Sequence, residues 1–400
     1  MSGSRRLGEL WRNRLGKAGQ DILERARTGL RMAGGERSSS SGDLGRGIFL
    51  VGSVWPGGDA EPFEGTVVID GRGVIDRMAP LSALSLPADI TVLGGPGYWI
   101  GPGVVDAHVH LAFGSAAACL AGGVVGVRDL GAPPALARQW RTGHRRPAPG
   151  RPFTAVAGPV LTAPRGYPSR TWGRERYAAP VGSAGQARQV VQRVAADGAD
   201  LIKIALEPGL VGWPVPSPAI VRAVVQAAHA AGLSVVAHAL QVDMVRRALD
   251  GGVDELAHTP TERLPEQLVD RIAEAGIGVV STLQTFFSAG SGRSAADNAT
   301  ALHRAGVRLR YGTDLGNEGT RPGVDPRELD RLADTGLGRS GALRAATEYS
   351  AGAPGIRRRT GLLRVGEPVA LVLLPANPLA EPGAWRSPTA VLADGRLIVT

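Results

Sequence analysis

Two histidines separated by one residue, His108 and His110, lie in the apolar run GVVDAHVHL, which has the character of a buried strand. Because side chains alternate along a strand, both imidazoles point to the same side. Further side chains of the metal-binding kind occur near the ends of later apolar runs: Lys203, His238, His258 and Asp314. Imidazole and carboxylate ligands favour zinc, so this set predicts a site for one or two divalent ions.

Lys203 is unusual because it stands in the apolar run ADLIKIAL, and the only other lysine in the sequence is Lys17. A buried ammonium group is costly, and burial lowers its pKa, so that the neutral amine becomes accessible. A neutral amine can add carbon dioxide to give a carbamate, whose two oxygens can bridge two cations, whereas arginine stays protonated. The alternative is a lysine that snorkels from the strand end or pairs with Glu207.

The elements that must position these side chains alternate along the region 101–364. Apolar runs of strand type are followed in most cases by helical stretches that end at glycine, such as SPAIVRAVVQAAHAAG. The eight candidate strands are GVVDAHVHL, VVGVRDL, FTAVAGPVL, ADLIKIAL, LSVVAHAL, ELAHT, IGVVSTLQ and VRLRYGTDL. Local propensity does not distinguish a (β/α)8 barrel from an open doubly wound sheet. Polar side chains at several strand ends favour the barrel, because barrel enzymes build their sites at that face.

Both flanks of this region consist of short runs of β type. Residues 46–100 contain IFLVGSVW and GTVVIDGRGVIDRM, and residues 365–400 contain ALVLLP and AVLADGRLIVT. We therefore expect a small composite β-sandwich domain built from 46–100 and 365–400, beside a barrel domain of residues 101–364. Residues 1–45 would precede both as an amphipathic helix and a linker rich in glycine and serine.

The N-terminal segment 5–31 carries eight basic side chains and has apolar residues at helical spacing. One interpretation is a helix that docks on the domain that follows. The other is a basic amphipathic surface that contacts a partner, an anionic surface or a second copy of the chain.

Composition argues against several other classes of protein. The net charge is +9, but the arginines are scattered without interleaved aromatic residues, so we expect no nucleic-acid partner. The single cysteine, Cys119, excludes an intrachain disulfide, fits a reducing compartment and is interpreted as a packing residue. No apolar run approaches the ~18 residues of a membrane span, and the first residues lack the apolar core of a secretory signal. The expectation is a cytoplasmic protein.

Seven segments occur in an order that resembles the metal-dependent amidohydrolase superfamily: GPGVVDAHVHL, GVRDLG, LIKI, VVAHA, ELAH, GTDLG and ALRAAT. The chain is most similar to the branch that includes imidazolonepropionase-like and Xaa-Pro dipeptidase-like enzymes. The resemblance covers about residues 47–400. It implies a distorted TIM (β/α)8 barrel with a small β-sandwich domain, and a hydrolase that acts on an amide C–N bond.

The resemblance also implies roles for the polar residues at the strand ends. The more buried of two ions would be held by His108, His110 and Asp314, and the other by His238 and His258. Zn²⁺ is the expected metal, with one or two ions per chain.

Two further roles follow from the same resemblance. Lys203, carboxylated by carbon dioxide, would bridge the two ions together with a hydroxide that attacks the scissile carbonyl. Asp314 would be the catalytic residue that accepts the proton of this hydroxide and delivers it to the leaving nitrogen. No glutamate closely follows His238, which argues against a deaminase that works beside a single metal ion.

The substrate is expected to be a small peptide, a cyclic amide or a peptide-like compound. Candidates for binding a substrate carboxylate are Arg165, Tyr167 and Arg170 in the segment APRGYPSRTWGR, with solvated loop charge as the alternative. The segment AFGSAAACLAGG after His110 is shorter than its family counterpart, which predicts a more open mouth and a bulkier substrate. Leu240 occupies a position where this branch often has a further histidine, so dipeptidase specificity does not transfer directly.

Two alternative functions stay open. One is cleavage of a larger modified peptide during natural-product maturation. The other is a metal-binding barrel that acts as a non-catalytic partner-binding protein, for example through residues 5–31. The intact set of His, Lys and Asp ligands favours a metal-dependent hydrolase.

Overall fold

The computed structural model describes residues 42–44, 47–80, 90–143, 147–209, 212–356 and 360–399. The predicted N-terminal helix and its partner-binding role lie outside these residues. Among the helices described, none is long and apolar enough to cross a membrane. The predicted compartment stays a prediction.

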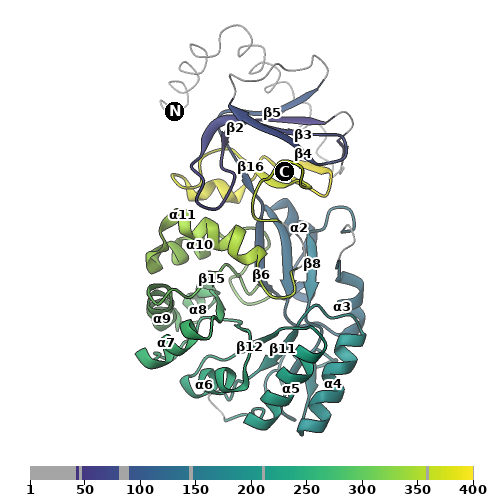
Figure 1. The fold of residues 1–400 in the computed structure, drawn as a ribbon, viewed down its shortest axis with the longest axis vertical. Coiled ribbons are helices and arrows are strands. Elements are labelled where there is room, and N and C mark those ends of the chain that lie inside the picture. Colours follow the sequence, from purple (N-terminus) through teal and green to yellow (C-terminus); the bar gives the residue numbers. More distant parts are fainter. Residues whose placement is uncertain are drawn as a thin grey trace.

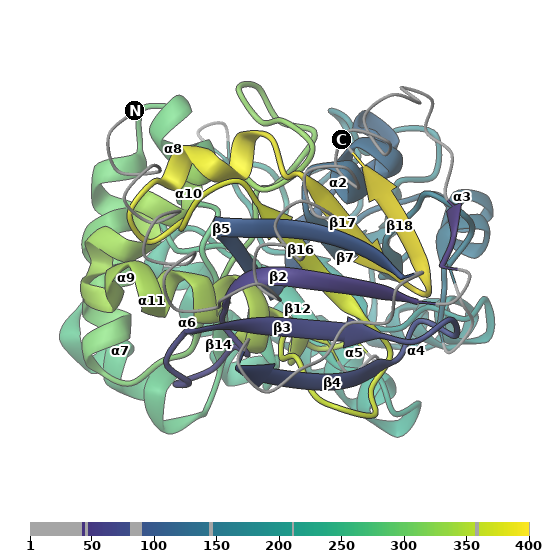
Figure 2. The same cartoon turned by 90° about the horizontal axis from the view of Figure 1, so that it is seen from above.

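The two flanks of the chain meet in one eight-stranded sheet, which lies at the top of Figure 1 and is seen from above in Figure 2. Its strands, in spatial order, are β1 (Gly42–Asp43), β18 (Arg396–Val399), β17 (Ala390–Ala393), β16 (Ala370–Leu374), β5 (Thr91–Pro102), β2 (Ile48–Val54), β3 (Phe63–Ile69) and β4 (Ile75–Pro80). The flanks join where β16 pairs with β5 in antiparallel register, Leu371 opposite Pro102. The predicted joining of both ends is therefore observed as a single continuous sheet. The sandwich and the exact domain boundaries stay predictions.

The middle of the chain forms the strands of a barrel. They are β6 (Val104–Val109), β7 (Val124–Asp129), β8 (Phe153–Val156), β9 (Val160–Thr162), β11 (Ile202–Ala205), β12 (Val235–His238), β13 (Glu255–Leu256), β14 (Gly278–Val280) and β15 (Leu309–Arg310). Each of the eight predicted runs contains one of them, and the third run contains β8 and most of β9. All pairings within these strands are parallel, and nearly every residue in them is buried, as expected when both faces of a sheet are covered.

The strands form two parallel sheets. One has the order β6-β7-β8, and the other has the order β10-β9-β11-β12-β13-β14-β15, with the short strand β10 (Ala178–Pro180) at its edge. At one seam, Val109 bridges Leu315 in parallel, and the Asp314 N–H donates to the carbonyl of His108 at 2.9 Å. At the other seam, the Asp200 N–H donates to the carbonyl of Val156 at 2.8 Å. At both seams, a strand of one sheet thus contacts a residue just outside a strand of the other, which fits a distorted TIM barrel.

Helices follow the barrel strands and lie on the outside in Figure 1. They are α2 (Ala116–Ala121), α3 (Pro134–Trp140), α4 (Ala184–Ala196), α5 (Pro218–Ala230), α6 (Val242–Gly251), α7 (Glu266–Glu274), α8 (Leu283–Ser288), α9 (Gly292–Arg304), α10 (Pro326–Leu332) and α11 (Gly338–Arg344). Local sequence sets several ends. The Ser217 side chain caps α5 ahead of Pro218, and Gly252 closes α6 in the left-handed conformation.

Cys119 lies in α2 and is buried. Burial raises the pKa of its thiol to about 12, so the reactive thiolate is not formed at neutral pH. This environment supports its interpretation as a packing residue.

Candidate active site

One cavity of about 390 Å³ opens at the C-terminal ends of the barrel strands, where barrel enzymes place their sites. All six residues predicted as metal ligands line it: His108, His110, Lys203, His238, His258 and Asp314. They come from the ends of β6, β11, β12, β13 and β15, which are far apart in the sequence. The barrel therefore brings the whole predicted set to one place.

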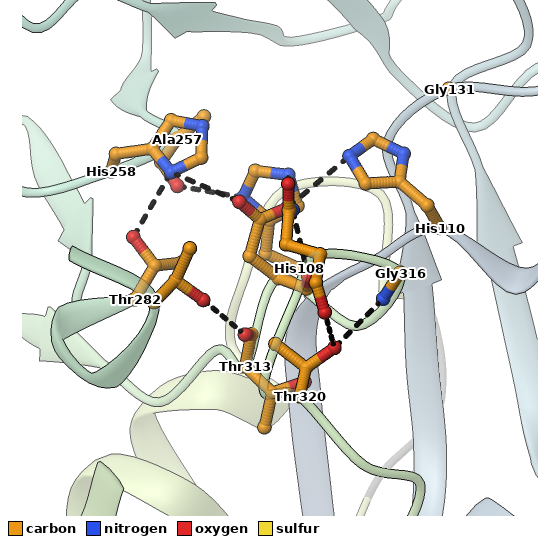
Figure 3. A network of polar contacts seen from close by, with 12 residues as sticks. His108, His110, Gly131, Ala257, His258, Thr282, Thr313, Gly316 and Thr320 are labelled. Carbon is orange, nitrogen blue, oxygen red and sulfur yellow. Dashed lines mark hydrogen bonds and ion pairs between the residues drawn. The ribbon is translucent and has the colours of Figure 1, made fainter. Parts of the chain in front are cut away.

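The imidazoles of His108, His110 and His258 face a common centre in Figure 3, and each lies within 4 Å of the carboxylate of Asp314. Asp314 Oδ1 lies 3.2 Å from His108 Nε2 and 3.3 Å from His110 Nε2, and its Oδ2 lies 3.9 Å from His258 Nδ1. Atoms bound to one ion at about 2.0–2.2 Å lie at comparable distances from one another. Ligand atoms of His108, His258 and Asp314 all fall within 4.8 Å of one another. This spacing suits a divalent cation.

The hydrogen bonds of His108 leave one ring nitrogen available. Its Nδ1 lies 2.8 Å from the carbonyl of Ala257, which fixes Nδ1 as the donor and Nε2 as the unprotonated atom. His108 Nε2 and Asp314 Oδ1 are buried and have no hydrogen-bond partner in the described part of the chain. Buried polar atoms are almost always satisfied, so this unsatisfied pair fits a bound cation.

Burial also sets the protonation state of the imidazoles. It lowers the pKa of His108 and of His258 well below the usual value, with nearby Lys203 and the other imidazoles acting in the same direction. Both rings are therefore neutral at pH 7, which is the form that binds a metal ion.

His258 is oriented by a strained residue. Its Nδ1 lies 3.0 Å from the hydroxyl of Thr282, which precedes α8 in the left-handed conformation with φ 44°. A β-branched residue adopts this conformation only where its surroundings impose it, and such strain gathers at functional sites. The ring of His258 lies 4.4 Å from that of His108 and 4.6 Å from that of His238, measured between centroids.

Asp106 is a residue whose role sequence reasoning missed. Its carboxylate accepts hydrogen bonds from the His108 N–H at 3.1 Å, the Thr313 N–H at 3.0 Å and the Thr313 hydroxyl at 2.5 Å. It thus couples the strand that carries His108 to the segment that carries Asp314. Burial raises the pKa of Asp106 to about 7, against the effect of these hydrogen bonds. The only signal in the sequence was an acidic residue inside an apolar run, two residues before His108.

Asp129, at the end of β7, supports the neighbouring turn in the same way. Its carboxylate accepts from the Leu111 N–H at 2.8 Å and from the Gly131 N–H at 3.1 Å. These bonds fix the backbone directly after His110. The segment GVRDLG contains Asp129, but its role as an acceptor requires the adjacent strand β6, which sequence alone did not place.

Lys203 is buried and lines the cavity. Burial lowers the pKa of its ammonium group to about 7, although the negative charge of Asp314 opposes the shift. The amine is therefore partly neutral near pH 7, as carbamate formation requires. Glu207, the alternative partner, lies against His238 instead, with 3.2 Å between Glu207 Oε2 and His238 Nε2.

A buried ionic network ties together the strands around this lysine. Arg128 on β7 and Arg310 on β15 both contact the carboxylate of Glu255 on β13, Arg310 Nη1 at 2.8 Å. Arg128 Nε also donates to the carbonyl of Ala107 at 2.7 Å. The network pairs buried charges that would otherwise lack a partner of opposite sign. The positive charge of Arg128 also contributes to the lowered pKa of Lys203. Sequence reasoning did not identify this network.

The three substrate-binding candidates are placed differently. Tyr167 lines the cavity, and its hydroxyl accepts a hydrogen bond of 2.9 Å from Trp172 Nε1. Burial raises the pKa of Tyr167 to about 12, so it stays a neutral phenol. Arg165 and Arg170 are exposed and are not among the residues that line the cavity. Their role in binding a carboxylate gains no support from their position.

The model of the Amidohydrolase family matches residues 99–398 of the chain. An imidazolonepropionase from Paracidovorax citrulli (strain AAC00-1) is 30% identical over 181 residues, which are 44% of this chain and 43% of that protein. The chain thus spans under half the length of this curated relative.

Two solved structures are similar over nearly their whole length. A prolidase complexed with N-methylphosphonate-L-proline has a TM-score of 0.73 and 25% identity, covering 88% of this chain and 99% of that one. A Xaa-Pro dipeptidase with methionine bound in its active site has a TM-score of 0.76 and 21% identity, covering 88% and 100%. The second likeness shows the fold alone. The family match spans the barrel, the end of β5 and the C-terminal strands of the flanking sheet, β16, β17 and most of β18.

Proposed function

This chain belongs to the amidohydrolase family, and we propose that it hydrolyses an amide C–N bond with the help of one or two divalent metal ions. The observation that carries the proposal is the carboxylate of Asp314, held between His108, His110 and His258 in a cavity at the strand ends. The names of its relatives suggest cyclic amides and Xaa-Pro peptides as the first compounds to test.

The donor set fits divalent zinc. We propose His108, His110 and Asp314 as ligands of the more buried ion, and His238 and His258 as ligands of the other. Neutral imidazoles, an unpartnered buried nitrogen and a carboxylate oxygen support this assignment. When bound, such ions supply an activated water and polarise the scissile carbonyl.

We assign two tasks to residues of the chain itself. Asp314 moves a proton from the attacking water to the leaving nitrogen, because its carboxylate lies at the centre of the cluster and lines the cavity. Lys203, as a carbamate, would offer an oxygen to each of the two metal positions. Its burial and lowered pKa support this role.

The test is metal-dependent hydrolysis by the purified full chain. Loaded with zinc, it is screened against imidazolone-type cyclic amides, Xaa-Pro and N-acyl amino-acid libraries, and longer modified peptides, and bound metal is measured by elemental analysis. Asp314→Asn should abolish turnover and leave the circular dichroism spectrum unchanged. Asp330→Asn, an exposed carboxylate on α10, is the matched control and should keep full activity.

Two results would overturn the proposal. One is full activity in Asp314→Asn, and the other is hydrolysis that survives complete removal of metal. A protein that binds zinc stoichiometrically but hydrolyses no amide in the screen would favour the non-catalytic alternative.

A further inference from the structure

Aromatic side chains line the cavity, and they come from separate segments of the chain. Phe113 lies in the short helix Leu111–Phe113 after β6, Tyr167 and Trp172 lie in the segment after β9, and Phe286 lies on α8. Only 4% of the chain is aromatic, so this concentration around one opening is not expected from composition.

The rings of the wall touch the predicted metal ligands directly. Ring centroids are 4.8 Å apart for Trp172 and His110, 5.2 Å for Tyr167 and His238, and 5.7 Å for Phe286 and His258. A molecule whose reactive carbonyl lies at the imidazoles therefore contacts these rings on its way in.

Outside this first layer the rings pack on one another and stay partly uncovered. Tyr167 stacks on Trp213 at 5.8 Å with 14° between the planes, and Phe113 stacks on Tyr177 at 5.7 Å. Phe113 is 50% exposed although it lines the cavity. Large apolar rings left open at the rim of a cavity present surface that an apolar or aromatic ligand can cover favourably.

The charged groups that line the cavity favour a ligand without a free carboxylate. No arginine is among the described residues that line it, and its lysine, Lys203, is buried. A bound carboxylate is stabilised by a guanidinium fork, and burying it without such a partner is costly. The lining residue Leu240 is apolar as well.

We propose that the substrate is an amide with an aromatic or large apolar group beside the scissile bond and no free α-carboxylate. This excludes a free dipeptide as the preferred substrate. The inference rests on the hydrolysis proposed above and names the substrate class of that same site. A cavity of about 390 Å³ lies within the range of about 300–1,000 Å³ that holds drug-sized ligands, which leaves room for such a group.

The experiment compares four matched substrates with the zinc-loaded full chain: phenylalanyl-proline and alanyl-proline, each as the free acid and as the C-terminal methylamide. We expect kcat/KM to be at least about tenfold higher for each methylamide than for the corresponding free acid. We also expect it to be at least about tenfold higher for each phenylalanyl compound than for the corresponding alanyl compound. Phe113→Ala and Trp172→Ala should each reduce the phenylalanyl-to-alanyl ratio. Phe113 is half exposed, so this variant does not threaten the fold.

Trp140→Ala is the matched control, because Trp140 is a partly buried tryptophan on α3 that does not line this cavity. The phenylalanyl-to-alanyl ratio of kcat/KM in Trp140→Ala should equal that of the wild type. Free acids hydrolysed as well as the methylamides, or a ratio that neither aromatic variant changes, would overturn the substrate class and leave amide hydrolysis standing.

Binding is measured separately, by titrating the metal-free wild-type chain with phenylalanyl-proline methylamide and following tryptophan fluorescence. Binding that weakens in Phe113→Ala, without hydrolysis by the zinc-loaded chain, would support the substrate class while the proposed function fails. If the phenylalanyl compounds are neither bound nor hydrolysed, the proposed substrate class is overturned.

Discussion

The hydroxyl of Thr313 donates a 2.5 Å hydrogen bond to Asp106 Oδ2 across 207 positions of the chain. This contact joins the first barrel strand to the segment after the last one, next to the proposed metal ligands His108 and Asp314. We expect Asp106→Asn to lower the free energy of unfolding by about 1–3 kcal/mol, because the amide nitrogen of asparagine cannot accept the bonds of a carboxylate oxygen. Urea denaturation of the metal-free protein measures this change, and an unchanged midpoint would contradict it.

The network around Glu255 should matter more for stability than any exposed ion pair. Glu255→Gln leaves Arg128 and Arg310 as buried cations without a charged partner, and we expect a loss of about 3–5 kcal/mol. Asp250→Asn, which breaks the exposed pair with Arg271, is the control and should cost at most about 1 kcal/mol. Equal effects of the two variants in urea denaturation would show that the network is not a stabilising unit.

Metal binding should stabilise the folded chain. A ligand that binds only the native state adds about 2.7 kcal/mol at a concentration one hundred times its dissociation constant. Zinc should therefore raise the melting temperature of the wild type, and a chelator should reverse the shift. His108→Ala should abolish most of the shift, whereas His303→Ala, a histidine on α9 outside the cluster, should retain it. The assignment of His108 fails if both variants respond alike.

Thr282 should contribute through the orientation of His258. Thr282→Val removes the hydroxyl that contacts His258 Nδ1, and we expect about 10–100-fold weaker zinc binding. Thr282→Ser restores the hydroxyl and should recover most of the affinity, which separates orientation from a general packing effect. Competition with a fluorescent zinc chelator measures the dissociation constants. Valine and serine variants of equal affinity would rule out the proposed role.

The pKa of Lys203 predicts a pH dependence of stability. Its folded-state pKa of about 7 lies below the unfolded value of 10.5, so the unfolded chain binds more protons between these two pH values. The contribution of Lys203 to the free energy of unfolding should therefore rise with pH from about 7 to 10.5, and its cost should be constant below pH 7. The difference between metal-free wild type and Lys203→Met, measured by urea denaturation at several pH values, isolates this contribution. A pH-independent difference would contradict the lowered pKa.

The strands and the six polar side chains at their ends were predictable because they depend on local patterns. Alternation puts His108 and His110 on one side of a strand, and buried parallel strands show as apolar runs. A lysine in such a run, Lys203, was visible without any knowledge of its neighbours. The sequence by itself therefore determined which side chains are available to the site.

Only the tertiary structure decided which groups meet across the barrel. The contact of Thr313 with Asp106 depends on how the two sheets join, and no periodicity along the chain encodes that closure. Tyr167 reaches the cavity while Arg165, two residues away, is exposed, because loop geometry sets side-chain direction independently of composition. The aromatic wall has the same origin. Its rings come from segments that follow different strands, so their proximity is a property of the closed barrel.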